Sequence, residues 1–186
     1  MLKAKIILVF TLSLILFPTF TCHSQDAAEL TDPASDGIYK MGPATVKFIP
    51  PPGWKRKTNA DPAIGIIHRV EFAHPSDELT TIQIEIQSPT PYANFGEEEA
   101  LNRLMEQSLG MSPQKITFAG QKAISSVSES FGSKIKMIYF VKGNALFYII
   151  ITPSKNEEFD KLLAVADECL KSFEIISIET SNNNSL

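Results

Sequence analysis

The sequence predicts an α+β fold in which a mainly antiparallel β-sheet is sandwiched between α-helices. Residues 80–87 alternate apolar and polar side chains, as in a strand with one buried face. Two longer segments, 97–109 and 156–171, repeat apolar residues at helical spacing. Short glycine-containing breaks separate several apolar runs, which is typical of antiparallel hairpins. The expected order is three strands, a helix, four strands, a helix and a last strand.

The first three strands are expected at about 45–49, 65–73 and 80–87. The segment PPPGW at 50–54 separates the first two and suits a type II turn, because glycine adopts the positive φ angle that such a turn requires. This turn is expected to direct Trp54 back onto the domain.

The first helix begins with three glutamates at 97–99, which the helix dipole favours, and Gly110 suits its end. Residues 146–151 are apolar on both faces, so their strand is expected in the middle of the sheet. The four strands between the helices are expected at about 114–118, 121–129, 134–141 and 145–152.

The second helix carries a buried stripe that includes Phe159, Leu162 and Ala166, and a short strand at about 173–178 follows it. Cys169 lies beside this stripe, where a thiol behaves as a small apolar group. We therefore expect Cys169 to be buried and unreactive.

The first 21 residues are typical of a secretory signal peptide. Lys3 and Lys5 precede an apolar run from Ile6 to Phe17, and Pro18 ends it. The run is too short to cross a bilayer as a permanent helix. The protein is therefore expected to leave the cytoplasm.

Two cleavage sites are consistent with this signal. A lipoprotein peptidase would cut before Cys22 after lipid is attached to its thiol, although Thr19 and Thr21 match a lipobox poorly. An ordinary signal peptidase would cut near Ser24 and release a free protein. The position of Cys22 directly after the apolar run favours lipidation, and hence a periplasmic or membrane-anchored lipoprotein.

Composition divides the remaining chain into three parts. Residues 22–43 are rich in small and polar residues and are expected to form a flexible linker. A single domain is expected over 44–178, followed by a disordered tail at 179–186. Removing residues 1–21 takes away two lysines and no acids, so the formal charge changes from −4 to −6. This acidic balance argues against nucleic-acid binding and leaves lipid at Cys22 as the only expected membrane contact.

The sequence indicates no catalytic, metal or cofactor site. His68, Glu71, His74 and Asp77 are evenly spaced, but along a strand the two histidines would lie about 20 Å apart, too far to share one zinc ion. No serine lies in a G-x-S-x-G turn, and FAGQKA fits a hairpin turn better than a phosphate loop. We therefore expect a protein that is not an enzyme.

Aromatic residues in loops are the best candidates for contact with a partner. Tyr92 and Phe95 lie in a proline-bounded loop, and Phe131 lies in another turn. Loops carry functional residues more often than frameworks do, and exposed aromatic side chains anchor protein partners. The alternative is that each ring folds back and covers the edge of the core.

The string VKFIPPPGW, the strand TTIQIEI and the helix that follows resemble the PsbP-like family. The paired strands IKMIYFVKGNALFYIIIT and the segment FDKLLAVADECLKSFEI extend this resemblance over residues 44–178. The same fold is known in Mog-type Ran-binding proteins and in bacterial DcrB-like lipoproteins. The resemblance implies an antiparallel sheet between helices and a non-enzymatic role in binding or assembly.

The export signal separates this chain from two branches of that fold. Plant PsbP proteins carry a plastid transit peptide, and Mog-type proteins act on a nuclear GTPase that an exported protein would not meet. The DcrB-like branch agrees with the expected location. We expect a module that contacts another envelope protein. The alternative is a carrier or sensor of a small apolar or lipid ligand, held between sheet and helix and lined by residues 145–151.

Overall fold

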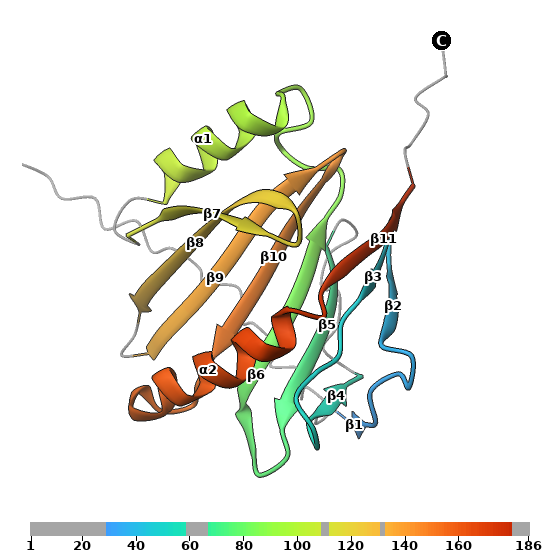
Figure 1. The fold of residues 1–186 in the computed structure, drawn as a ribbon, viewed down its shortest axis with the longest axis vertical. Helices are drawn as coiled ribbons and strands as arrows, with labels where there is room; N and C mark the ends of the chain where they lie inside the picture. Colours follow the sequence, from blue (N-terminus) through green and yellow to red (C-terminus); the bar gives the residue numbers. More distant parts are fainter. Residues whose placement is uncertain (1–28, 59–66, 109–111, 131–132, 180–186) are drawn as a thin grey trace, which may run out of the picture.

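The computed structural model describes residues 29–58, 67–108, 112–130 and 133–179 (Figure 1). Its largest element is a sheet of eight strands in the order β1-β4-β5-β6-β10-β9-β8-β7, in which every neighbouring pair is antiparallel. The strands are β1 (Leu30–Thr31), β4 (Lys55–Lys57), β5 (Ile67–His74), β6 (Asp77–Gln87), β7 (Gln114–Phe118), β8 (Gln121–Ser130), β9 (Ser133–Lys142) and β10 (Ala145–Thr152).

Strand β10 lies inside this sheet, between β6 and β9, as its apolar sequence predicts. Phe147, Ile149 and Ile151 alternate along it and are completely buried on one face. Ile84 of β6 lies opposite Ile149, and Ile82 lies opposite Ile151. The central strands therefore supply much of the apolar core.

The two helices, α1 (Glu97–Gln107) and α2 (Phe159–Leu170), cover opposite faces of the sheet. Ser108, at the end of α1, forms a hydrogen bond with the hydroxyl of Tyr139 on β9. Lys136, three residues earlier on β9, forms an ion pair with Asp167 of α2 at 3.2 Å. Side chains three residues apart on a strand point to opposite faces, so the sheet lies between the helices, and the predicted fold class is confirmed (Figure 1).

Neither helix in the described part of the chain has the length and hydropathy needed to cross a bilayer. The first helix is described to Gln107, and residues 109–111 lie outside the described part. The second begins as a 3-10 turn, η1 (Asn156–Glu158), which continues into α2. The segment predicted as one helix is thus divided into two helix types.

The sequence did not predict a second sheet, which has three strands. It packs against the same face of the first sheet as α2. Its order is β11-β3-β2, with β2 at Ile38–Met41, β3 at Ala44–Lys47 and β11 at Glu174–Ile178. Tyr39 and Phe48 contact Phe72 of the large sheet, with ring centroids 5.4 and 5.3 Å apart. The expected last strand is therefore real but belongs to this second sheet.

The prediction of a flexible linker over residues 22–43 is corrected by the structure. Strands β1 and β2 lie inside this range, and residues 22–28 lie outside the described part. Tyr39 and Met41 are buried, because the IYKM sequence of β2 alternates exposed and buried positions. The ordered body therefore begins well before residue 44.

Candidate functional site

The structure removes Tyr92 from the set of exposed aromatic residues. Its side chain is 8% exposed and belongs to the core, and its hydroxyl donates a hydrogen bond to Oε1 of Gln107 at 2.5 Å. Burial raises the pKa of Tyr92 above its ordinary value. Tyr92 therefore fastens its loop to α1, and its ring is not available to a partner.

Phe95, the other predicted loop aromatic that the structure describes, does not form an exposed patch with Tyr92. Phe95 is partly buried against the core, and the guanidinium of Arg103 lies 4.0 Å from the centre of its ring. Phe131 and the candidate lipidation site Cys22 lie outside the described residues. The candidate partner surface at Tyr92 and Phe95 is thus, in the described part, a covered edge of the core.

The evenly spaced acids and histidines have separate local roles. His68 packs against Gly42, where an added Cβ would lie 2.2 Å from the imidazole. Glu71 pairs with Lys57 at 2.9 Å. Within the described ranges, no group of three or more His, Cys, Asp or Glu side chains is arranged to hold a metal ion.

Cys169 is partly buried beside the core, close to the position that the helix pattern predicts. Burial raises the pKa of its thiol, and the nearby carboxylate of Glu168 raises it further. The thiol is therefore protonated at neutral pH and is a weak nucleophile.

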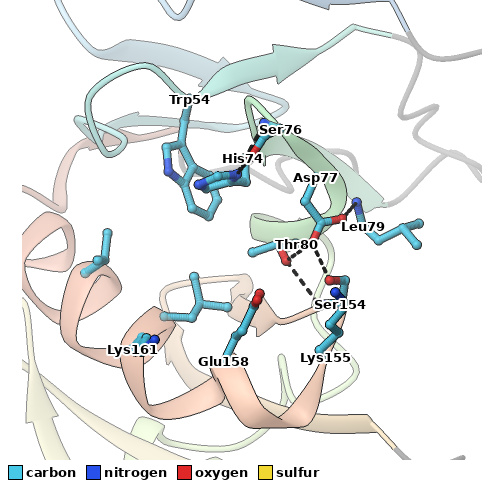
Figure 2. Close-up of a pocket in the computed structure, with 12 residues that line it drawn as sticks. Trp54, His74, Ser76, Asp77, Leu79, Thr80, Ser154, Lys155, Glu158 and Lys161 are labelled. Carbon is cyan, nitrogen blue, oxygen red and sulfur yellow. Dashed lines mark hydrogen bonds between the residues drawn. The ribbon is translucent and has the colours of Figure 1, made fainter.

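A groove lies between the turn that joins β5 to β6 and the start of α2. It has a volume of about 780 Å³, within the range of known ligand pockets (Figure 2). One wall is the turn between β5 and β6, the opposite wall is the start of α2, and Trp54 closes one side (Figure 2). Its lining residues are Trp54, His74, Ser76, Asp77, Leu79, Thr80, Ser154, Lys155, Glu158, Lys161, Leu162 and Val165.

The PPPG turn positions Trp54 in this groove. Gly53 has a φ angle of 81°, and the backbone N–H of Trp54 donates to the carbonyl of Pro51 at 3.1 Å. These are the features of the predicted type II turn. The indole is 5% exposed and meets the ring of His74 edge-on, with centroids 5.6 Å apart. Trp54 thus belongs to the core and also borders the groove.

Asp77 connects the two walls of the groove. Its carboxylate accepts hydrogen bonds from the hydroxyl of Ser154, from the hydroxyl of Thr80 at 2.9 Å and from the backbone N–H of Leu79 at 3.3 Å (Figure 2). The bond from Ser154 is the largest cause that lowers the pKa of Asp77, so its carboxylate remains ionised at neutral pH. The hairpin of β5 and β6 is thereby held to the segment that precedes α2.

Apolar side chains are unusually exposed around this groove. Leu79 is 73% exposed and Val165 is 44% exposed. A smaller hollow of about 260 Å³ lies on the other side of Trp54, bordered by Ile49, which is 53% exposed. Large apolar side chains gathered at a concave surface are typical of an interaction site.

Sequence reasoning missed this groove because its walls come from three distant segments. One signal was present, since Leu79 is in phase with Gln83 and Glu85, on the face of the strand opposite to its buried isoleucines. Alternation therefore predicts that Leu79 points away from the core. The sequence did not show that α2 begins beside it.

Tyr148 lies on the opposite face of the sheet and is partly buried against the core. Burial raises the pKa of Tyr148 to about 12, and the nearby Tyr92 and Glu85 add to this shift. Its ring packs against Tyr139, with centroids 6.3 Å apart. Tyr139 contacts the end of α1 through its hydrogen bond with Ser108.

No protein-family model and no curated protein sequence matches the chain. Among solved structures, it is similar to cyanobacterial PsbP (CyanoP) from Synechocystis sp. PCC 6803, with a TM-score of 0.45 and 15% identity over 86% of this chain and 99% of that one. It is also similar to LpqN, described as involved in cell envelope biogenesis of Mycobacterium tuberculosis, with a TM-score of 0.44 and 13% identity over 81% and 92% of the two chains.

The resemblance to PsbP that the sequence motifs indicated is thus also found in the structure. Similarity at this level does not identify what the protein binds. The groove and its side chains are the features of this chain that bear on that question.

Proposed function

We propose that this protein is an exported, non-enzymatic binding module that docks another protein of the cell envelope in the groove beside Trp54. The observation that carries the proposal is the exposure of Leu79 and Val165 on either side of a concave surface. Burial of such side chains is the main source of affinity in protein interfaces, and aromatic residues at the centre strengthen it.

The polar side chains of the groove support binding more than catalysis. The hydrogen bonds that Asp77 accepts from Ser154, Thr80 and Leu79 come from these same two walls, so its carboxylate holds the walls together. Nδ1 of His74 accepts a hydrogen bond from the backbone N–H of Ser76 at 3.3 Å. Nδ1 of His74 also lies 3.0 Å from the hydroxyl of its neighbour Ser76, so Asp77 and His74 both make local contacts that shape the walls of the groove.

The signal-like segment at residues 1–21 supports export, and Cys22 supports attachment to a membrane through lipid. An intact-mass measurement on the protein from membranes tests both points. A chain that starts at Cys22 and carries acyl mass is expected. A soluble chain that starts near Gln25 would contradict lipidation and leave export intact.

The alternative of a small-ligand carrier requires space between the sheet and α2. In the described core this layer is filled: Phe147 stacks on Phe140 with centroids 4.9 Å apart, and Phe140 meets Phe173 at 6.3 Å. Residues 145–147 are completely buried among such neighbours. This packing fills the space beside residues 145–147, whereas the groove beside Trp54 has the volume of a ligand pocket, so a small ligand in that groove is the alternative that the crosslinking experiment must distinguish from docking.

Crosslinking in cells tests the proposed function. A photoreactive amino acid in place of Leu79 is expected to give a discrete crosslinked product with another envelope protein. The same group in place of Ile176, which is 46% exposed on the second sheet, is the control. Equal yields of products at both positions would contradict docking at the groove.

A further inference from the structure

Two hollows of the surface share one tryptophan. Trp54 lines the groove of about 780 Å³ and also the smaller hollow of about 260 Å³, which lies between the segment before β2 and the PPPG turn. The smaller hollow is below the range of about 300–1,000 Å³ that is usual for small-ligand pockets. It therefore suits a side chain of a larger occupant better than a whole small ligand.

Large apolar side chains gather around these two hollows. The described part of the chain has six exposed large apolar residues, and three of them line the hollows. Ile49 lies at the smaller hollow, and Leu79 and Val165 lie at the groove. They come from three distant segments and meet on the two sides of Trp54, which is itself only 5% exposed. The surface that is open to a partner is therefore made by these aliphatic side chains.

The lining of the groove carries no net charge. Asp77 and Glu158 contribute two carboxylates, and Lys155 and Lys161 contribute two ammonium groups. The carboxylate of Asp77 already accepts three hydrogen bonds from the walls of the groove. The other three charges alternate in sign along the α2 wall, three residues apart. A charged occupant would lose its hydration here and would meet no field of opposite sign in return.

The smaller hollow is neutral as well. Its two charged residues, Asp32 and Lys55, form an ion pair with each other at 2.5 Å. Four prolines, Pro33 and those at 50–52, also line it. Proline has no backbone N–H, so these residues contribute backbone acceptors and no donors. A polypeptide can supply N–H groups to such acceptors, whereas an acyl chain cannot.

We propose that one uncharged, apolar segment of the partner protein lies across Trp54 and places side chains in both hollows. This inference rests on the proposed docking function and extends its surface to Ile49. Alternate side chains on one face of an extended segment are about 7 Å apart, so two of them can enter hollows that a single tryptophan separates. Contact with Ile49, Leu79 and Val165 removes apolar surface from water, and this supplies the affinity in place of charge.

Photocrosslinking from position 49 in cells tests the inference. A photoreactive amino acid in place of Ile49 is expected to give a protein product of the same mass as one in place of Leu79. The same group in place of Ile176, whose exposure is similar, is the control. A small ligand or a lipid would instead give an adduct of low mass at positions 49 and 79, and this result would overturn the inference.

Second-site variants of the protein with the crosslinker at position 49 test the chemistry of the occupant. Leu79→Ser is expected to lower the yield of the product at least about threefold, because one segment contacts both hollows. Ile176→Ser is the matched control and is expected to leave the yield unchanged. Glu158→Gln and Lys161→Gln each remove one charge of the groove, and each is expected to change the yield less than about twofold.

The outcomes separate this inference from the docking function on which it rests. A partner captured from position 79 and not from position 49 would leave docking intact and exclude the smaller hollow. An unchanged product with Leu79→Ser would mean that the two hollows bind separately, and a strong loss with Glu158→Gln or Lys161→Gln would mean that charge contributes to recognition. Each of these results overturns the inference. A yield at position 79 no greater than at position 176 would instead contradict docking itself.

Discussion

At the scale of single residues, Tyr92 illustrates how a loop aromatic becomes part of the core. Replacing it with alanine is expected to lower the free energy of unfolding by about 3 kcal/mol, as for other buried aromatic side chains. Tyr92→Phe keeps the ring and loses only the bond to the exposed Gln107, at a cost of about 1 kcal/mol or less.

Denaturant unfolding of the two variants measures both costs. The free energy of unfolding is expected to decrease from wild type to Tyr92→Phe to Tyr92→Ala. Binding at the groove is expected to be unchanged in any variant that remains folded. If Tyr92→Ala kept full stability and lost partner binding, the loop would be the contact surface after all.

Asp77 acts at the scale of elements, because it joins the hairpin of β5 and β6 to the segment before α2. Asp77→Ala is expected to reduce the free energy of unfolding by about 1–2 kcal/mol, the cost of losing charge-assisted hydrogen bonds. The groove walls then lose their connection, so binding is expected to weaken as well. Asp77→Asn keeps one carbonyl acceptor, so its free energy of unfolding is expected to lie between those of the wild type and of Asp77→Ala.

The pH dependence of this effect follows from the lowered pKa of Asp77. The carboxyl of Asp77 binds a proton more readily in the unfolded chain than in the folded one. Its stabilising contribution is therefore fully present above the pKa of about 3.9 in the unfolded chain, and it is lost as the pH falls through the lower pKa in the folded chain. Urea unfolding from neutral to acidic pH is expected to show wild type and Asp77→Ala converging below about pH 4. A difference in free energy of unfolding between the two proteins that stays constant with pH would contradict a lowered pKa of Asp77.

The periodicity of apolar residues predicted those helices and strands in which buried and exposed positions alternate regularly. Strand β10 was placed in the centre because both its faces are apolar, and it does lie between β6 and β9. Strand β4 was missed because its sequence, KRK, has no alternation; it is a short strand that pairs between β1 and β5. Whether such a short strand forms depends on its pairing with neighbouring strands, and the local sequence does not contain this information.

The groove was beyond sequence reasoning for a similar reason. Trp54, Leu79 and Val165 are distant in the chain, and only the packing of α2 against the sheet brings them together. The type II turn that positions Trp54 was predicted, because Gly53 is needed there at positive φ. Local chemistry thus predicted one border of the groove and tertiary packing supplied the rest.

At the scale of the whole molecule, the small sheet depends on residues that the composition assigned to a linker. Strand β2 adds the buried side chains of Tyr39 and Met41, and the backbone N–H of Phe48 donates to the carbonyl of Gly37 at 2.8 Å. Burial of two such side chains contributes about 3–6 kcal/mol. Residues 29–43 are therefore expected to be required for a stable domain.

Two truncated chains test this boundary, one that begins at Glu29 and one that begins at Ala44. Because they differ only in residues 29–43, the shift between their denaturant midpoints measures what β1 and β2 contribute. The longer chain is expected to unfold cooperatively, and the shorter one at much lower denaturant or without a cooperative transition, since Phe72 loses its contact with Tyr39. Equal midpoints would restore the linker interpretation for residues 22–43 and place the domain boundary at residue 44.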